Sequence, residues 1–399
     1  MDRLIVMNTL RSPYDNGITI LLVLFAAASM LSVAISMICL GLIGLTMIVR
    51  GLRYRDYPGN VPFMWSVGLL VLWGLLMIPF STEPWFSLKM SKRFALYVAL
   101  WVGACLIEGE DRRRLVFWAM VAGITSNAIY TLLFEEYQID GTGRRVTMVQ
   151  NSSMTGAWIM ASISVLMFAF MVSLRNGRLQ LLLGAAQVPI LFALYLSRTR
   201  SSWVGFLAGL LIVLLIKKKR LIPVLALAVI LLFVIGPPGF QTRVTSITDP
   251  TFRSNHHRID QWKAGLELVK RSPITGIGDV YPKKMIHEFT DYSESRPTDM
   301  RHIHHSLLTA ALFWGIPGLV FLLVLMGHLL VLLIRAWRKM DETEPYRQAW
   351  ILGGIGMWVF YNLTGLADAL ATDPEMSLVF LVVVGIGIGK SDPGLSRSE

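Results

Sequence analysis

Long apolar runs, separated by short basic loops, fill this sequence from residue 17 almost to its C-terminal end. A helix rises about 1.5 Å per residue, so about 20 apolar residues cross the roughly 30 Å hydrocarbon core of a bilayer. Charged residues are only 16% of the 399 residues, whereas soluble domains carry about 25%. These features exclude a soluble globular protein, a disordered chain and a disulfide scaffold. They predict an all-α, polytopic membrane protein.

Twelve membrane-spanning helices are expected from the apolar runs. The first two share residues 17–50 and turn near Ser32, and because many runs follow, the first is interpreted as a span rather than a cleavable signal. The other ten are expected near residues 61–80, 93–107, 115–134, 154–174, 179–197, 202–216, 221–236, 306–334, 348–367 and 376–389.

The distribution of Lys and Arg predicts the orientation. With the N-terminus in the cytoplasm, every second loop is basic, as the positive-inside rule requires, and the C-terminal tail is cytoplasmic too. The predicted organisation is therefore nine spans in residues 1–236, one large outer loop with short amphipathic helices in 237–305, and three spans plus a cytoplasmic tail in 306–399.

The formal net charge of +11 would suggest nucleic acid as the partner of a soluble protein. Here most basic residues lie in loops, where they set orientation and contact anionic lipid headgroups. Membrane lipids are therefore the expected partners, and nucleic acid is not. Cys39 and Cys105 both lie in apolar runs and are expected to be buried hydrophobic side chains without a disulfide or metal role.

Two arginines lie on the expected outer side of the membrane and so depart from the positive-inside pattern. Arg198 and Arg200 lie in the very short outer turn Ser197–Ser202 between two expected spans. Charge at that depth is costly and usually functional. The alternative is an arginine that reaches out to lipid phosphate, an interpretation that also suits Lys89, Lys92 and Arg93 on the same side.

Six of the seven histidines fall in residues 237–305. A metal site needs ligands at a usable spacing with carboxylate or cysteine support. His302 and His305 are three residues apart, but no carboxylate motif accompanies them. We therefore expect no metal and no other cofactor.

The segment Asn255–Lys270 is predicted to form a helix with Asn255 as its N-cap. Its apolar residues Ile259, Trp262, Leu266 and Val269 recur at helical spacing and predict one apolar face. Arg258 falls in the first turns. An amphipathic helix resting on the bilayer explains Trp262 well, but it explains Arg258 only in part.

His304 and His305 follow Arg301 and directly precede the apolar run from Leu307. They are therefore expected at the N-terminal mouth of a spanning helix, where partial positive charge and free N–H groups favour phosphate. A histidine there resists protonation and can act as a base near neutral pH. The alternative is a helix-capping side chain.

Isolated arginines and a neutral histidine on one side suit a particular chemistry. Arginine binds phosphate through a fork of N–H groups, and histidine can take a hydroxyl proton. The combination favours transfer of a group from a phosphate-bearing donor to an alcohol. A channel or ion-coupled transporter would show charges and broken helices at mid-membrane. Here Asp368 and Asp373 lie near an outer end instead.

Three segments resemble the motifs of the bacterial O-antigen ligase and polymerase superfamily. They cover roughly residues 190–320 in the family's order. The segments are LSRTRSSWVGF at 196–206, RIDQW at 258–262 followed by SPITGIG at 272–278, and HHSLL at 304–308 followed by GIPGL at 315–319.

The resemblance implies a metal-free, inverting glycosyltransferase in the bacterial inner membrane. Its donor would be O-antigen linked to undecaprenyl pyrophosphate, and its acceptor a sugar hydroxyl of the lipid A core on the periplasmic face. Arg200 and Arg258 would bind the pyrophosphate and His304 would be the base. The further residues implied in donor binding are Arg144, Arg145, Arg198, Trp262, Arg301 and His305.

Several alternatives stay open at this point. Position 305 is His where the family usually has Asn, so the base is His302, His304 or His305. Arg198 competes with Arg200 for the first motif. A polymerase differs from a ligase only in its acceptor, and a protein-targeted transferase often has an extra region after its last span. A lipid-linked glycan flippase would form no glycosidic bond.

Overall fold

A computed structural model describes residues 13–54, 61–140, 143–150, 152–280, 303–340 and 343–390. Arg301 and His302, two of the residues singled out above, lie outside this part of the chain, as does the side chain of Arg144.

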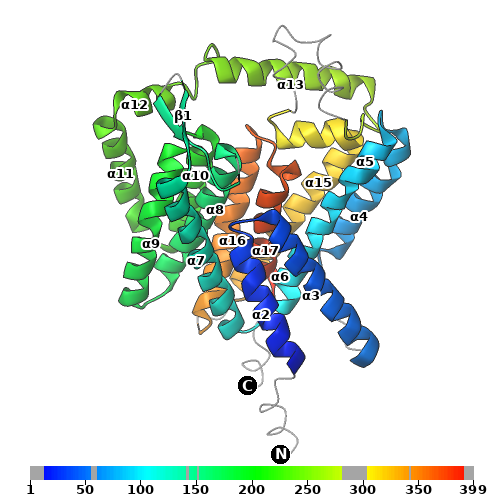
Figure 1. Ribbon diagram of the computed structural model, residues 1–399, viewed down its shortest axis with the longest axis horizontal. Coiled ribbons are helices and arrows are strands. Elements are labelled where there is room, and N and C mark those ends of the chain that lie inside the picture. Colours follow the sequence, from blue (N-terminus) through cyan, green and yellow to red (C-terminus); the bar gives the residue numbers. More distant parts are fainter. Residues whose placement is uncertain are drawn as a thin grey trace, which may run out of the picture.

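The protein is a bundle of helices that run side by side, with one helix lying across one end (Figure 1). The helices in chain order are α2 (Pro13–Ala28), α3 (Val33–Tyr54), α4 (Met64–Leu76), α5 (Pro84–Met90), α6 (Tyr97–Leu106), α7 (Glu110–Phe134), α8 (Ser153–Ser173), α9 (Gly177–Leu196), α10 (Arg200–Lys217), α11 (Ile222–Ile235), α12 (Pro238–Thr245), α13 (Arg253–Arg271), α15 (Ser306–Arg338), α16 (Pro345–Gly365) and α17 (Pro374–Ile388). Short 3₁₀ turns cover Ile78–Phe80, Ser91–Leu96, Lys219–Leu221 and Leu370–Thr372.

The predicted all-α membrane architecture is confirmed. Each of the twelve expected spans coincides with a helix, and α2 and α3 are separated by a turn at residues 29–32, as the sequence predicts. In the described chain, six helices are long and apolar enough to cross a membrane, or seven if the bent pair α11–α12 counts as one span. The count of twelve spans therefore stays a prediction, because helices such as α6, with ten residues, are shorter than a full crossing.

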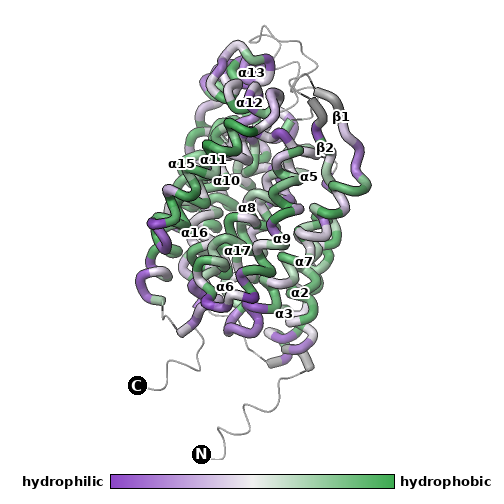
Figure 2. Tube along the Cα trace, turned by 90° about the vertical axis from the view of Figure 1, so that its left-hand side faces the viewer, coloured by the Kyte–Doolittle hydropathy of each residue, from purple (hydrophilic) through white to green (hydrophobic). Residues whose placement is uncertain are grey.

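The core lies where α8, α16 and α17 pack together, and these three helices are buried along most of their length. Figure 2 shows apolar residues along the bundle wall and polar residues gathered toward its two ends. That distribution matches a protein whose wall meets lipid and whose ends meet water.

One end of the bundle carries α12, α13 and a two-stranded antiparallel hairpin, β1 (Tyr137–Asp140) with β2 (Gly143–Val146). We call it the α13 end, and the opposite one the far end. The chain bends by 119° between α11 and α12. The hairpin is an addition to the helical fold that the sequence analysis did not predict.

The position of α13 matches the predicted helix, but its N-cap and its buried face differ from the prediction. Asn255 lies inside the helix and does not cap it, because its side chain contacts Arg200. Leu266 is exposed, and the buried residues of α13 are Asp260, Gln261, Ala264, Gly265 and Leu268. Gly265 explains the change of face, since a Cβ there would lie 2.5 Å from Ile303. The small residues let α13 approach the chain before α15 closely.

Two glycines from different motifs join α15 to the segment that follows α13. Gly315 has φ +69° and interrupts α15, and Gly276 also has φ +69°. A Cβ on Gly276 would lie 2.6 Å from the Gly315 nitrogen. The amide of Ile277 donates to the Leu312 carbonyl at 2.8 Å. Both glycines are needed for this close backbone contact, since other residues rarely adopt positive φ.

Candidate functional site

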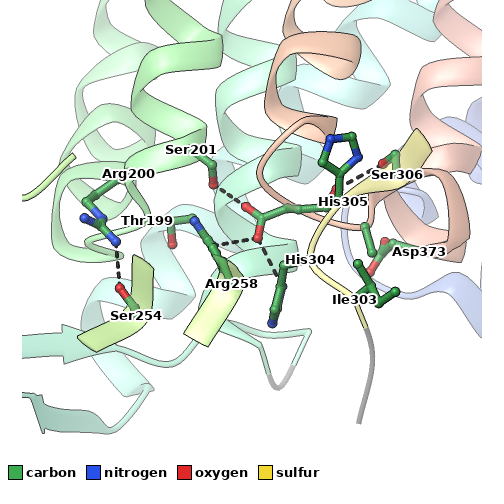
Figure 3. Close-up of polar contacts among 12 residues, drawn as sticks. Thr199, Arg200, Ser201, Ser254, Arg258, Ile303, His304, His305, Ser306 and Asp373 are labelled. Carbon is green, nitrogen blue, oxygen red and sulfur yellow. Dashed lines mark hydrogen bonds and ion pairs between the residues drawn. The ribbon is translucent and has the colours of Figure 1, made fainter. Parts of the chain in front are cut away.

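A buried carboxylate, Asp368, lies at the centre of the polar residues of the α13 end. Its side chain is fully buried in the loop between α16 and α17. Arg258 Nη2 lies 2.8 Å from Asp368 Oδ1, and the Ser201 hydroxyl donates to Asp368 Oδ2. His304 Nδ1 lies 3.3 Å from Oδ1. Figure 3 shows Ser201, Arg258 and His304 pointing toward one carboxylate. We call these four residues the Asp368 cluster.

His304 and His305 have different surroundings, although they are adjacent in the chain. His305 is the N-cap of α15, and its Nδ1 accepts a hydrogen bond from the Leu308 amide at 3.3 Å. Burial lowers the pKa of His305 below its usual value. The His304 carbonyl accepts a hydrogen bond from Trp262 Nε1 at 3.0 Å. His304 thus faces the carboxylate, while His305 performs the capping role that was the alternative for this pair.

Arg258 reaches the cluster from the first turns of α13, as the sequence suggested. Its side chain is 19% exposed, and that of His304 is 21% exposed. Asp368 beneath them is inaccessible to solvent. The side chains of Arg258 and His304 are therefore accessible to an incoming molecule, and the buried carboxylate of Asp368 orients both of them.

Arg200 begins α10 and is held by uncharged groups on both sides of the α12–α13 loop, namely Ser246 directly after α12 and two residues in the first turn of α13. Its Nη1 donates to the carbonyl and hydroxyl oxygens of Ser246 at 2.5 and 2.9 Å. Its Nη2 donates to Ser254 Oγ and Asn255 Oδ1, both at 2.6 Å. The guanidinium also lies over the Phe252 ring at 5.0 Å. Its charge is thus solvated by polar oxygens, and the loop is fixed beside the Asp368 cluster.

The turn before α10 is held by two other arginines. Arg145 Nε, from the hairpin, donates to the Ser197 carbonyl at 2.9 Å. Arg243 Nε, from α12, donates to the Arg198 carbonyl at 3.1 Å. Arg198 itself has φ +54°, a left-handed conformation that is unusual for a residue with a side chain. Arg145 therefore lies beside the first motif, where it positions the backbone.

A groove of about 340 Å³ leads to the cluster between α10, α13 and α16. Its polar lining comes from Arg200, Ser201, Thr248, Asn255 and Arg258, and Trp262 lines it as well. The rest is mostly apolar and includes residues such as Val204, Ile259 and Leu363. Such a groove can hold a molecule with an anionic group next to an apolar chain.

Arg93, which the sequence suggested as a lipid anchor, is part of the interior instead. Its Nη2 forms an ion pair with Asp279 Oδ1, and its guanidinium lies 5.5 Å from the centre of the Phe313 ring. Burial raises the pKa of the Asp279 carboxyl, and the charge of Arg93 counteracts that shift. This pair joins the segment before α6 to the chain that follows α13.

Within the described residues, no group of three or more His, Cys, Asp or Glu side chains is arranged to hold a metal ion. The expectation of metal-free chemistry stays a prediction for experiment.

Asp368 is the site residue to which the sequence analysis assigned no role. It is 110 residues from Arg258 and 167 from Ser201 in the chain. One signal was present, since Asp368 is a carboxylate directly after one expected span, between two apolar runs. Acidic residues at such positions are functional by default.

Fold and site together define a multi-pass membrane protein with an Arg–His–Asp site at one end of its bundle. Residues 185–323 match the family model described as O-antigen ligase. That region contains all three motifs, so the predicted resemblance to the superfamily of O-antigen ligases and polymerases is confirmed over these residues. The chain thus carries the region typical of enzymes that transfer glycans in membranes.

Comparison with solved structures finds a chain from a study of polymerization and crosslinking by a peptidoglycan synthase complex. It is 15% identical, with a TM-score of 0.49, over 82% of this chain and 95% of that one. No curated protein matches the chain.

Proposed function

We propose that this protein is an O-antigen ligase. It would transfer O-antigen glycan from undecaprenyl pyrophosphate to a sugar hydroxyl of the lipid A core, completing lipopolysaccharide. The observation that carries the proposal is the convergence of His304 and Arg258 on the buried Asp368 beside an apolar groove. The family match supports the class of reaction. The alternation of basic loops supports placing the site in the periplasm and the termini in the cytoplasm.

In the proposed reaction His304 is the general base. Its Nδ1 faces Asp368, which leaves Nε2 to accept the proton of the acceptor hydroxyl. The acceptor oxygen forms a bond to the anomeric carbon as the bond from that carbon to the phosphate oxygen breaks. Attack opposite the leaving group inverts the anomeric centre. The buried carboxylate orients the imidazole and stabilises the imidazolium that forms, as carboxylates do in other His–Asp pairs.

Arg258 is the direct ligand of the leaving pyrophosphate in this proposal. The phosphate gains negative charge as the bond breaks, and a fixed guanidinium stabilises that charge in the transition state. Arg200 contributes its positive charge and holds the α12–α13 loop, since its Nη1 and Nη2 already donate to Ser246, Ser254 and Asn255. The apolar wall of the 340 Å³ groove would accept the first part of the lipid chain.

The test is a transfer assay with purified protein, undecaprenyl-pyrophosphate glycan and rough lipopolysaccharide, in the presence of EDTA. A ladder of modified lipopolysaccharide on a gel supports both the ligase and metal-independent chemistry. Longer lipid-linked glycans with unmodified lipopolysaccharide would instead identify a polymerase. Loss of product that added divalent metal restores would overturn the metal-free mechanism.

A flippase is the alternative from another class of protein. It moves lipid-linked glycan across the bilayer and forms no glycosidic bond. The absence of any new linkage with every acceptor, together with movement of the donor between leaflets of a proteoliposome, would replace the ligase with that function.

A further inference from the structure

A second, larger groove lies at the far end of the bundle, away from the Asp368 cluster. Its volume is about 1610 Å³, above the roughly 300–1,000 Å³ of sites for drug-sized ligands. Apolar side chains of three helices form its walls, including Met171 of α8, Leu210 and Leu214 of α10, and Val224 and Ala228 of α11. We call it the basic groove, because the charged residues that line it are Arg175, Lys217 and Lys218.

The groove exists because α11 stands away from the bundle. None of the fourteen residues of α11 is buried, and several of its large apolar side chains are more than half exposed. In Figure 1 this helix lies at the edge of the bundle. An apolar helix in this position needs an apolar molecule on its inner side as well as its outer side. In a membrane that molecule is a lipid.

The polar mouth of the basic groove determines which lipid fits. Lys217 is the last residue of α10, and Lys218, Lys219 and Arg220 follow it directly. Arg175 lies on the opposite side of the groove, between α8 and α9. Lys217 Nζ also donates to Gln348 Oε1 at 2.8 Å.

Glu344, which lies between the lining residues Thr343 and Pro345, does not cancel this charge, because it is buried and paired with other arginines. Its Oε2 accepts a hydrogen bond from Arg347 Nη1 at 3.0 Å. The mouth therefore combines basic side chains with uncharged hydrogen-bonding groups such as Asn176 and Gln180.

We propose that the basic groove binds one anionic phospholipid, with its phosphate at Arg175, Lys217 and Lys218 and its acyl chains between α10 and α11. Basic pockets between membrane helices are typical sites for anionic headgroups. The proposal does not depend on the glycan-transfer reaction, because it concerns the other end of the molecule.

Such a lipid would also support the α13 end through α11. This helix leads into α12, and Ser246, the residue directly after α12, accepts two hydrogen bonds from Arg200. Arg243 of α12 contacts the Arg198 carbonyl. A lipid that fixes α11 against α10 therefore also steadies the loop that Arg200 holds.

The experiment is native mass spectrometry of the full chain in a non-ionic detergent, titrated with phosphatidylglycerol, phosphatidylcholine or glycerol phosphate. The test variant is Arg175→Gln with Lys218→Gln, since both side chains are exposed and their loss leaves the core intact. The matched control is Arg53→Gln with Arg114→Gln, which removes two exposed charges from the same end, outside the groove.

We expect tight binding of one phosphatidylglycerol to the unmodified chain and about 30-fold weaker binding to the test variant. That factor corresponds to about 2 kcal/mol, with about 1 kcal/mol for each basic residue and 1.4 kcal/mol for each tenfold change. The control should bind as the unmodified chain does. Ala228→Trp fills the groove between α10 and α11 and should also weaken binding.

Three results would overturn the proposal. Equal losses in the test and control variants would mean that the lipid responds only to surface charge. Equal affinity for phosphatidylcholine would mean that the basic residues do not select the headgroup. Binding of glycerol phosphate as tight as that of the lipid would mean that the apolar walls take no part. All three are binding results, so they are independent of whether the chain transfers glycan.

Discussion

The two ends of the bundle each bury a cluster of charged side chains, and the clusters differ in how the charges are matched. At the far end, Arg113 is fully buried and lies 3.6 Å from Glu110 and 3.7 Å from Glu344. Arg347 bonds to Glu344 at 3.0 Å. Two arginines thus meet two glutamates, and Glu110 also accepts hydrogen bonds from the first amides of α16. We call these four residues the Arg113 cluster.

At the α13 end the matching is uneven. Asp368 pairs with Arg258 and lies near His304, whereas the hydrogen bonds of Arg200 go to serine and asparagine oxygens. In the Arg113 cluster the two arginines and the two glutamates balance each other's charges. Together with the neighbouring Arg200, whose hydrogen bonds go only to uncharged groups, the Asp368 cluster sets two arginines against one carboxylate, and it adjoins a groove. An anion that enters the groove would balance this excess positive charge.

The difference indicates different roles for similar residues. A buried ion pair whose charges balance contributes through packing and specificity, and its rupture leaves a charge unpaired. A site that keeps positive charge in excess is prepared to stabilise an anion that forms during a reaction. Substitutions at the two ends should therefore affect different measurements, namely stability at the far end and transfer at the α13 end.

The largest expected effect is on transfer in His304→Ala. Loss of a general base lowers the rate by about 10²–10⁴-fold, and the thermal stability of the purified protein should change little. Initial rates of the transfer assay give the result. The control is His256→Ala, which removes a histidine of the same end that is 57% exposed and lies on α13.

The same assay on His305→Ala separates the two adjacent histidines. His305 caps α15, so its loss should lower stability and leave most of the activity of the folded protein. Full activity in His304→Ala, with activity lost in His305→Ala, would transfer the role of base to His305.

Breaking the Arg113 cluster should act on stability. Glu344→Ala leaves Arg113 and Arg347 without the carboxylate that both approach, and removing one partner of a buried pair costs about 3–5 kcal/mol. Thermal unfolding in detergent measures the loss. Activity per folded molecule at low temperature should match that of the unmodified protein. A rate that falls as steeply as in His304→Ala would mean that the far end takes part in the reaction.

A smaller effect on transfer is expected from Arg258→Lys. Lysine keeps the charge near Asp368 but lacks the planar fork that binds phosphate at two points. Removal of one fixed donor from a transition state costs about 10²–10³-fold, so this milder change should cost roughly 10–100-fold. Arg253→Lys, at an exposed position of the same helix, is the control. Equal rates in both variants would show that Arg258 acts as a simple charge.

The helices and the side chains at their ends were predictable because they depend on local sequence. Apolar runs predict the spans, the interruption near Ser32 predicts the turn between α2 and α3, and the polar residues before Leu307 place His304 at a helix start. These properties follow from residues close together in the chain.

The partners within the site could not be predicted, because they are set by how distant helices pack. Asp368 meets Ser201 across 167 residues of sequence. The face that α13 buries depends on Gly265 fitting against Ile303, which overrides the apolar pattern of Ile259, Trp262, Leu266 and Val269. Arg200 was expected in the turn and is the first residue of α10, and its partners at the end of α12 and the start of α13 are 46 and 54 residues away in the chain.

The smallest expected effect is on the pH dependence of stability, and it depends on Asp373, a buried carboxyl at the α13 end. Unlike Glu344, it is held by a hydroxyl and an amide, since Thr155 Oγ1 donates to it at 3.1 Å and the Met376 amide at 2.8 Å. Burial, and then the charge of Glu375, raises the pKa of Asp373 from 3.8 to about 7. The folded protein therefore holds this proton at pH values where the unfolded chain has released it.

Stability should accordingly decrease as the pH rises from about 4 through about 7, by at most about 1.4 kcal/mol per pH unit for one proton. Asp373→Asn removes the titrating group and should flatten this part of the profile of unfolding temperature against pH. The comparison variant is Glu344→Gln, which removes a buried carboxylate that is paired with Arg347, so it should lower the unfolding temperature. Equal slopes in the unmodified protein and Asp373→Asn would show that folding does not raise the pKa of Asp373, and that this carboxyl does not hold its proton at the α13 end.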